Sequence, residues 1–457
     1  MKYLLADIGS TFTKLCLADV EQRTVLGTTI APTTVKTDVN QGVEAARQKL
    51  GKKAEDVEAT LACSSAAGGL RMVAVGLIPN LTAEAARLAA LGAGGKVVET
   101  FSFLLTEADL GRIRALRPDI LLLSGGTDGG DVKHILHNAR QIQNHLPDVP
   151  LIVAGNRSAH DEIRRILDGR REVWFVENVM PDFKQLRLEP AREAIRRVFL
   201  ERIVEAKGLT RLCDRARILM PTPEAVFKAA VLLSKGIPNS EKGMGELLIV
   251  DIGGATTDVY SCAEGAPALA TVRQRGLREP CEKRTVEADI GMRHTASHLL
   301  EEPALKEIIR ENGAEWEEMQ TWTQTLTGNP GRLPQSEKEQ AMDTALASAA
   351  CEVAVGRHCG RWEEAFCPDG RFYFQDGKDL SNVRRVIGSG GPIVNSKTPR
   401  AILAGAKKKD GEPALKPRDP NYYLDTQYLL WAMGLLAEVD RAAALEIMKK
   451  NILPLTK

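Results

Sequence analysis

The chain carries one short motif twice, and the two copies constrain its fold more than any other feature. They are Asp7-Ile8-Gly9-Ser10-Thr11-Phe12-Thr13-Lys14 and Asp251-Ile252-Gly253-Gly254-Ala255-Thr256-Thr257-Asp258, whose corresponding positions differ by 244. In each copy an apolar run ends in the acid and leads into a turn of glycine and hydroxyl residues. A second stretch of strand character follows, at 14–20 and at 258–262. The pattern predicts two β-hairpins with matching tips.

The two tips have the composition of an anion site. Glycine exposes backbone N–H groups and lets a phosphate come close, while serine and threonine hydroxyls donate further hydrogen bonds. The predicted nucleotide-binding residues are Gly9, Ser10, Thr11, Thr13 and Lys14 in the first copy and Gly253, Gly254, Thr256 and Thr257 in the second. One such motif alone is equally compatible with an ordinary hairpin, and the matched second copy weakens that alternative.

The acid that opens each motif predicts a magnesium ion. A carboxylate beside a triphosphate repels it unless a divalent cation lies between them, so Asp7 and Asp251 are predicted to hold Mg²⁺ through water. Both loops lead from strand to strand. A dinucleotide fingerprint or a Walker loop leads from a strand into a helix, so neither design fits.

A third glycine-rich loop predicts the adenosine side of an ATP site. The apolar pair Val386-Ile387 runs into Gly388-Ser389-Gly390-Gly391-Pro392, where a base and ribose can lie against a backbone without Cβ atoms. The loop Ser124-Gly125-Gly126-Thr127-Asp128-Gly129-Gly130 competes for this role, but it precedes the second hairpin. It is equally compatible with a tight turn between a strand and a helix.

The order of two phosphate loops and an adenosine loop resembles the actin-like ATPase superfamily of acetate and sugar kinases, heat-shock chaperones and actin (ASKHA). Pro221-Thr222-Pro223-Glu224-Ala225-Val226 matches its first interdomain connection, and residues 425–435 match its closing helix. The resemblance implies an α/β, two-lobed actin-like ATPase (ribonuclease-H-like) fold with an inserted α/β subdomain and a helical insertion in the second lobe. It also implies ATP and Mg²⁺ as cofactors.

Three further segments resemble the accessory proteins of cobalamin-dependent glutamate (methylaspartate) mutase, the GlmL or MutL family, which is unrelated to the mismatch-repair protein of that name. They are Thr82-Ala83-Glu84-Ala85-Ala86-Arg87, the loop 123–130, and Arg284-Thr285-Val286-Glu287-Ala288-Asp289-Ile290-Gly291-Met292-Arg293. The resemblance implies an ATP-hydrolysing chaperone that reactivates an adenosylcobalamin-dependent mutase by letting damaged cofactor exchange. The mutase is then the expected partner.

Roles follow from this layout. Asp251, or failing that Glu224, is predicted to orient or deprotonate the attacking water, and Asp7 to hold the metal. Lys14 is predicted either to offset phosphate charge or to face outward. Two other classes of function stay open. One is a small-molecule kinase with a sugar-kinase-like reaction, and the other is an actin-like nucleotide-dependent scaffold.

The composition gives no sign of a nucleic-acid or membrane partner. Formal net charge is +1, and no apolar stretch approaches the roughly 20 residues of a membrane span. We therefore expect a cytoplasmic protein without a signal peptide. Cys351, Cys359 and Cys367 recur every eight residues but lack known ligand spacings, and His294 and His298 lack the glutamate of a zinc protease between them.

The loop positions predict four parts. The first ATPase lobe is expected at 1–97 and 210–244, and an inserted α/β subdomain at 98–209. The second lobe is expected at 245–292 and 366–457, and a helical insertion at 293–365. Within the first part, the pattern predicts a helix that starts at Ala83, is capped by Thr82 and ends near Gly92.

Overall fold

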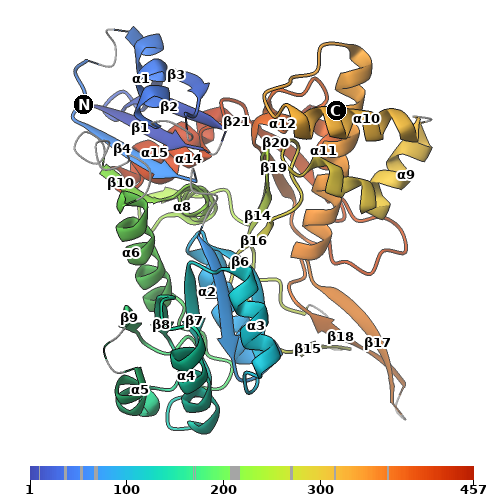
Figure 1. Ribbon diagram of the computed structural model, residues 1–457. Helices are drawn as coiled ribbons and strands as arrows, with labels where there is room; N and C mark the ends of the chain where they lie inside the picture. Colours follow the sequence, from blue (N-terminus) through green and yellow to red (C-terminus); the bar gives the residue numbers. More distant parts are fainter. Residues whose placement is uncertain are drawn as a thin grey trace.

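The computed structural model describes residues 1–9, 11–34, 39–51, 55–65, 70–167, 169, 171–205, 217–267, 271–312, 315–367 and 370–456. Figure 1 shows two lobes side by side at the top, a compact subdomain below the first lobe, and a long β-ribbon below the second. Of the predicted nucleotide-binding residues, Ser10 lies outside the described residues.

The first lobe is built on a five-stranded sheet with the order β10-β4-β1-β2-β3. Strands β1, β2 and β3 are antiparallel, and β4 and β10 continue the sheet in parallel to β1. The bounds are β1 Lys2–Ile8, β2 Phe12–Asp19, β3 Thr24–Pro32, β4 Ala59–Ser64 and β10 Arg217–Pro221, with helices α1 Val39–Leu50 and α8 Thr222–Lys235 and the short pair β11 Gly236–Ile237 and β12 Glu241–Lys242.

The second lobe repeats this topology. Its sheet has the order β16-β14-β13-β19-β20-β21, with β13, β14 and β16 antiparallel and with β19 and β20 parallel to β13. The strands are β13 Leu247–Ile252, β14 Thr257–Cys262, β16 Glu282–Glu287, β19 Arg385–Ser389, β20 Asn421–Asp425 and β21 Ile452–Pro454. The sequence repeat is therefore a structural repeat, and the predicted two-lobed ribonuclease-H-like fold is confirmed.

One hydrophobic core joins the lobes. It contains Leu5 of the first sheet, Ile249 of the second, and buried residues of α8, α14 Leu430–Leu436 and α15 Arg441–Asn451. At the crossing of α8 and α14, a Cβ on Gly434 would lie 1.8 Å from the backbone oxygen of Ala225. The two helices thus touch through their backbones, and only glycine fits at this point.

Replacing Gly434 by Ala is expected to destabilise the protein by about 1–3 kcal/mol, because the added methyl group must push α14 away from α8. Chemical unfolding would measure this. Gly111, in helix α3 (Glu107–Leu116), is a matched control, since no atom lies within 4 Å of the position that an added methyl group would take. Gly111→Ala should leave stability unchanged or raise it, and an equal loss in both variants would contradict the packing argument.

The subdomain below the first lobe contains a five-stranded parallel sheet with the order β6-β5-β7-β8-β9. Its elements are β5 Arg71–Gly76, the π-helical turn Pro79–Ala83, α2 Glu84–Gly92, β6 Lys96–Ser102, α3 Glu107–Leu116, β7 Ile120–Leu123, α4 Lys133–His145, β8 Leu151–Val153, the short turn Arg157–Ala159, α5 His160–Leu167, β9 Val173–Phe175 and α6 Glu189–Glu205. Strands β5 and β6 both begin before the predicted boundary at residue 98. Strand β5 pairs in parallel with both β6 and β7, so this sheet extends across the predicted boundary.

The segment predicted as a helical insertion is largely helical, with the 3₁₀ turn Ala296–Glu301 and helices α9 Pro303–Asn312, α10 Trp316–Gly328 and α11 Glu337–His358. The ribbon that follows is the three-stranded sheet β15 Val272–Arg275, β18 Gly370–Asp376 and β17 Arg361–Cys367. Helices α12 Gly391–Val394 and α13 Pro399–Leu403 and the turn Ala404–Ala406 complete the second lobe. The four-part division itself stays a prediction.

Candidate functional site

The two repeated motifs form the same turn. In the first, the backbone N–H of Gly9 donates to the carbonyl of Phe12 at 3.1 Å, and in the second Gly253 donates to Thr256 at 2.8 Å. The strand registers also match, because Asp7 lies opposite Lys14 and Asp251 opposite Asp258. The local sequence therefore determines both the turn and the side of the hairpin on which each acid lies.

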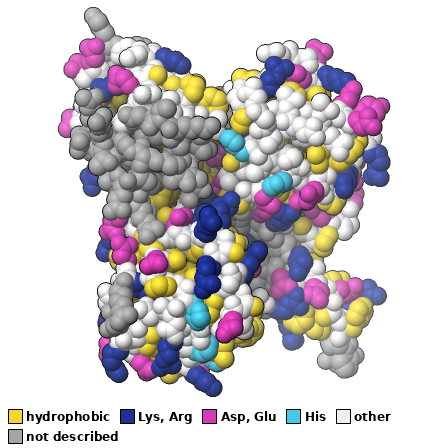
Figure 2. Space-filling view, viewed as in Figure 1, with side chains coloured by type: hydrophobic (Ala, Val, Ile, Leu, Met, Phe, Trp, Pro, Cys, Tyr) yellow, Lys and Arg dark blue, Asp and Glu magenta, His cyan; other side chains and the backbone are white. Residues whose placement is uncertain are grey.

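The two hairpin tips line one cavity between the lobes, with a volume of about 1720 Å³. The upper half of Figure 2 shows the hollow that separates the lobes. The tips approach closely, because the Thr11 hydroxyl lies 3.3 Å from Nε2 of His294, whose backbone N–H donates to the carbonyl of Gly254 in the second tip at 2.9 Å. The hairpin residues that line the cavity are Asp7, Gly9, Thr11, Phe12 and Lys14 in the first lobe and Asp251, Gly253, Gly254, Ala255, Thr256 and Asp258 in the second.

Asp7 is held in a fixed orientation at the floor of the cavity. Its carboxylate accepts a hydrogen bond from Lys14 Nζ at 2.7 Å and another from the Thr222 hydroxyl at 2.7 Å. Thr222 is the first residue of α8, and its place between two prolines is the only feature of the sequence that marks it. Because the acid is only 1% exposed, these two donors determine where its oxygens lie.

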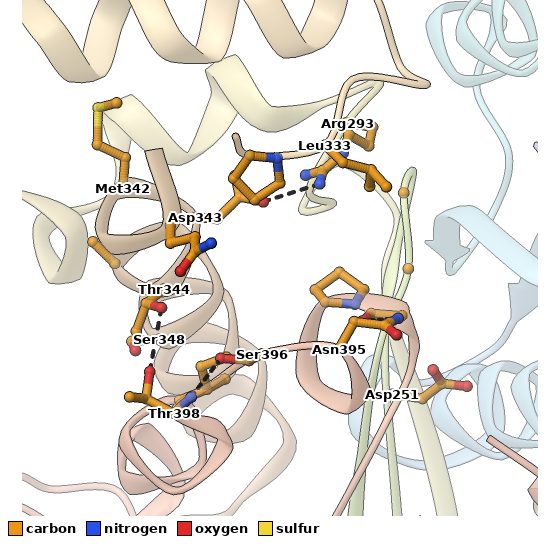
Figure 3. A pocket seen from close by; sticks show the side chains of 18 of the residues that line it. Asp251, Arg293, Leu333, Met342, Asp343, Thr344, Ser348, Asn395, Ser396 and Thr398 are labelled. Carbon is orange, nitrogen blue, oxygen red and sulfur yellow. Dashed lines mark hydrogen bonds and ion pairs between the residues drawn. The ribbon is translucent and has the colours of Figure 1, made fainter. Parts of the chain in front are cut away.

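Asp251 faces the same cavity from the second lobe, as Figure 3 shows. Burial raises its pKa to about 7, and the nearby carboxylate of Asp258 adds to this effect. The Tyr428 hydroxyl donates to Asp251 at 3.4 Å, and Lys14 Nζ lies 4.2 Å from the centre of the Tyr428 ring. Asp251 can therefore accept a proton near neutral pH, although the positive charge of Lys14 opposes the rise of its pKa.

A polar wall closes the second-lobe side of the cavity. Arg293 donates to Asp343 at 2.9 Å, and the indole N–H of Trp322 donates to the other oxygen of Asp343 at 2.8 Å. Figure 3 shows Asn395 opposite this pair, with the hydroxyls of Thr344 and Thr398 deeper in the cavity. Such a wall offers donors and acceptors to a ribose or a base.

The third glycine loop contributes less to the cavity than predicted. Of its four predicted residues only Gly391 lines the cavity, followed by Pro392. Ser389 instead donates to the buried carboxylate of Asp425 at 3.1 Å. Added Cβ atoms on Gly388 and Gly390 would collide with the side chain of Ile393 at 2.7 Å and with the backbone oxygen of Ile252 at 2.2 Å. Gly388, Ser389 and Gly390 therefore pack the loop against the sheet, and their contact with adenosine stays a prediction.

Two predicted hydroxyls also point away from the cavity. Thr13 is fully buried and hydrogen-bonds Thr33 at 2.9 Å, while Thr257 donates to the carbonyl of Ile290 at 2.8 Å. Strand alternation explains this, since Thr13 and Thr257 lie on the opposite face of their strands from Lys14 and Asp258. Both residues support the hairpins from behind.

Glu224 lies outside the cavity between the lobes. It lines a separate pocket of about 390 Å³ beside Arg192 and Phe227, and it pairs with Arg196 at 2.9 Å. Burial raises its pKa to about 7, although Arg196 and Lys228 oppose this. The predicted role of Glu224 in positioning water does not fit this place, because Glu224 is two residues beyond Thr222 and projects from another side of α8.

Replacing Glu224 by Gln is expected to change how stability depends on pH. Because the pKa of Glu224 is raised from 4.5 to about 7 in the folded protein, its contribution is complete below about pH 4.5 and is lost as the pH rises through 7. The Tm of the unaltered protein should therefore fall relative to that of the variant between pH 5 and pH 8, because glutamine stays neutral throughout. Glu189→Gln, at a mostly exposed carboxylate of the same pocket, is the control. If the curves of Tm against pH for Glu224→Gln and for the unaltered protein stay parallel, the raised pKa of Glu224 is contradicted.

The comparisons with known proteins agree on one family. The family model described as "MutL protein" matches residues 3–452. A curated protein named "Protein MutL" from Clostridium tetanomorphum is 45% identical over 457 residues, which cover 98% of this chain and 99% of that protein. The chain belongs to the MutL protein family. The family resemblance seen in the sequence is thereby confirmed.

Solved structures resemble this MutL family member only distantly. One is an activator of the 2-hydroxyisocaproyl-CoA dehydratase from Clostridium difficile with bound ADPNP, with 10% identity, a TM-score of 0.32 and 98% of each chain covered. Another is a glycerol dehydratase reactivase, with 11% identity, a TM-score of 0.34, and coverage of 96% of this chain and 99% of that one. At such TM-scores neither likeness supports a statement about this chain.

Arg284, in one of the segments that resemble the MutL family, connects the second hairpin to helix α2 and the residues just after it. Arg284 of β16 is buried and pairs with Asp258 at 2.6 Å, and its Nη1 donates to the carbonyls of Leu91 at 2.6 Å and Gly95 at 3.1 Å. These carbonyls lie at the carboxyl end of α2. Since Asp258 lines the cavity, Arg284 joins the second hairpin to the subdomain below the first lobe, a contact that the sequence analysis missed.

The chemistry of the cavity suits magnesium better than a soft metal. Among the described residues no three His, Cys, Asp or Glu side chains are grouped as a metal site. Cys351 and Cys359 are buried thiols, and the side chain of Cys367 lies outside the described residues. Two carboxylates that face one cavity fit a cation that keeps most of its waters.

In the described part of the chain, no helix has the length and apolar character needed to cross a bilayer.

Proposed function

We propose that this chain is an ATP-hydrolysing accessory protein that reactivates an adenosylcobalamin-dependent mutase such as glutamate mutase. The observation that carries the ATP part is that two matched hairpins, each with an acid at its base, line one cavity between two lobes. The mutase part is supported by membership of the MutL family together with the resemblance of residues 82–87, 123–130 and 284–293. No described residue identifies which mutase is served.

The proposed mechanism assigns one task to each charged group. Thr11 and Thr256 bind phosphate oxygens from opposite lobes, and Lys14 offsets their charge. Asp251 takes the proton of the attacking water, which its raised pKa permits near neutral pH. Asp7 and Asp251 would hold Mg²⁺ through water, and the ion would neutralise negative charge on the phosphates.

Closure of the lobes then depends on the γ-phosphate. While it is attached, the nucleotide touches both hairpin tips and favours the closed arrangement; after hydrolysis and release this link is lost. The core shared by α8 and α14 lets the lobes move as bodies about one joint. Opening and closing of this kind is a means of prying open an inactivated mutase so that damaged cofactor leaves.

The deciding experiment measures ATP hydrolysis by the full chain with and without a purified adenosylcobalamin-dependent mutase that has been inactivated. We expect slow hydrolysis alone, faster hydrolysis with the mutase, and recovery of mutase activity when ATP, Mg²⁺ and fresh adenosylcobalamin are added. Recovery that is equally fast with a non-hydrolysable ATP analogue would contradict the proposal.

A small-molecule kinase is the second candidate, because one observation favours it. The cavity of about 1720 Å³ exceeds the range of about 300–1,000 Å³ usual for a small ligand, so it has room for a metabolite beside ATP. Transfer of labelled γ-phosphate from ATP to a sugar or acid, instead of to water, would reveal this activity.

A further inference from the structure

The carboxyl ends of the parallel strands in the lower subdomain form an unusually apolar surface. Figure 1 shows these ends at the bottom of the subdomain, away from the two lobes. Five of the eleven exposed large hydrophobic side chains among the described residues follow these strands, so the exposed apolar surface is concentrated here. We call this surface the apolar end, and its members are Ile78, Phe103, Leu104, Val132 and Phe183.

The loops of the apolar end lie side by side. The N–H of Phe103, after β6, donates to the carbonyl of Leu77, after β5, at 3.1 Å. The N–H of Asp128, after β7, donates to the carbonyl of Pro181, after β9, at 2.9 Å. The strand order β6-β5-β7-β8-β9 then places the apolar side chains along one row of loops. None of them belongs to a hydrophobic core.

Dedicated contacts hold the backbone of Phe103 in a conformation that leaves its side chain exposed to water. Phe103 has a φ of 65°, a left-handed conformation that is a true outlier for a bulky residue, and 57% of it is exposed. Asn138 of α4 is buried and fixes this turn on both sides, since its Nδ2 donates to the carbonyl of Phe103 at 2.9 Å and its Oδ1 accepts from the N–H of Leu105 at 2.9 Å. The fold therefore keeps the backbone of Phe103 in a strained conformation that leaves its aromatic ring exposed.

The glycine loop at this end is tied into the fold by neighbouring side chains. The N–H of Gly129 donates to the buried Asn156 side chain at 3.1 Å, and Asn178 ties Asp128 in place at 3.0 Å. The loops of this edge carry four acids and three bases, so their formal charges nearly cancel: Asp128, Asp131, Glu177 and Asp182 against Arg157, Lys184 and Arg187. Figure 2 likewise shows both signs of charge mixed over the lower left of the molecule. A nucleic acid or an anionic membrane would find no net attraction here.

The apolar end is also joined to the nucleotide cavity. Helix α2 begins directly after the turn that carries Ile78, and its carboxyl end is held by Arg284, the partner of Asp258. Because the apolar end is connected to the cavity in this way, it suits a partner whose affinity for this surface changes with the bound nucleotide. A permanent contact between two copies of the chain would need no such connection.

We propose that the apolar end docks the enzyme that this chain serves, through an apolar and uncharged patch on that enzyme. This inference rests on the proposed function. Exposed aromatic side chains held rigidly at such a patch are the residues that most often dominate binding between proteins.

The test measures binding of the full chain to a purified adenosylcobalamin-dependent mutase by biolayer interferometry, with ADP and with ATP. The variant Phe103→Ser/Phe183→Ser should bind the mutase at least tenfold more weakly, with unchanged affinity for ATP and an unchanged circular dichroism spectrum. Phe366→Ser is the matched control, because Phe366 is an equally exposed aromatic residue on the β17 ribbon. The control should bind as the unaltered protein does.

The outcomes separate the two proposals. If the unaltered protein does not bind the mutase, the proposed function fails, and the docking surface falls with it. If it binds and the double variant binds equally well, or the control loses as much, only the docking surface is overturned. It is also overturned if the double substitution abolishes self-association or binding to neutral lipid vesicles while mutase binding is unaffected.

Discussion

Replacing Asp251 by Asn is expected to abolish ATP hydrolysis while ATP still binds. Asparagine keeps the size of the side chain but cannot accept the proton of an attacking water, and loss of a general base lowers rates by about 100-fold to 10,000-fold. The raised pKa of about 7 lets this carboxyl accept a proton near neutral pH. Single-turnover hydrolysis of labelled ATP and equilibrium binding of a fluorescent ATP analogue measure the two effects separately.

Asp7→Asn is the informative comparison for this variant. Asp7 already accepts hydrogen bonds from Lys14 and Thr222, so its predicted task is to hold the metal and not the proton. We expect Asp7→Asn to raise the Mg²⁺ concentration needed for half-maximal activity, whereas Asp251→Asn should stay inactive at any Mg²⁺ concentration. Unchanged turnover in Asp251→Asn would remove this residue from the mechanism.

The sequence predicts those parts of the site that depend on local structure. Each hairpin needs only an apolar run, a glycine turn and a return strand, so both could be located from about a dozen consecutive residues. The positions of Asp7 and Asp251 in their hairpins follow from the same pattern. That both tips would meet at one cavity came from the repeat and the family resemblance, because no local signal brings residues 244 apart together.

Predictions that depend on distant partners are less successful. Thr82 is expected from the sequence to cap a helix, but its hydroxyl accepts from the N–H groups of Leu77 and Ile78 across a π-helical turn, and α2 begins at Glu84. In the sequence, Ser389 resembles a ligand-binding hydroxyl. In the structure it instead donates to Asp425, which is 36 residues away in the chain. In both cases the residue type is compatible with either role, and only the tertiary neighbour decides between them.

Replacing Arg284 by Met is expected to destabilise the protein more than Gly434→Ala does. The substitution would leave Asp258 buried without its positive partner and would free the carbonyls of Leu91 and Gly95. Breaking one side of a buried ion pair typically costs about 3–5 kcal/mol. Urea unfolding followed by circular dichroism would measure the loss.

A double variant separates the part of the stability loss that comes from the unpaired charge from the part that comes from lost packing. When Asp258→Asn is added to Arg284→Met, no unpaired carboxylate remains, so the double variant should be more stable than the single one. Arg284→Lys keeps the positive charge but cannot reach Asp258 and the α2 carbonyls at once, because lysine lacks the planar fork of arginine. It should therefore fold and hydrolyse ATP, yet bind the mutase with the same affinity in ADP and in ATP. If Arg284→Lys keeps a nucleotide-dependent affinity, the coupling does not pass through this side chain and α2 must be moved by another contact.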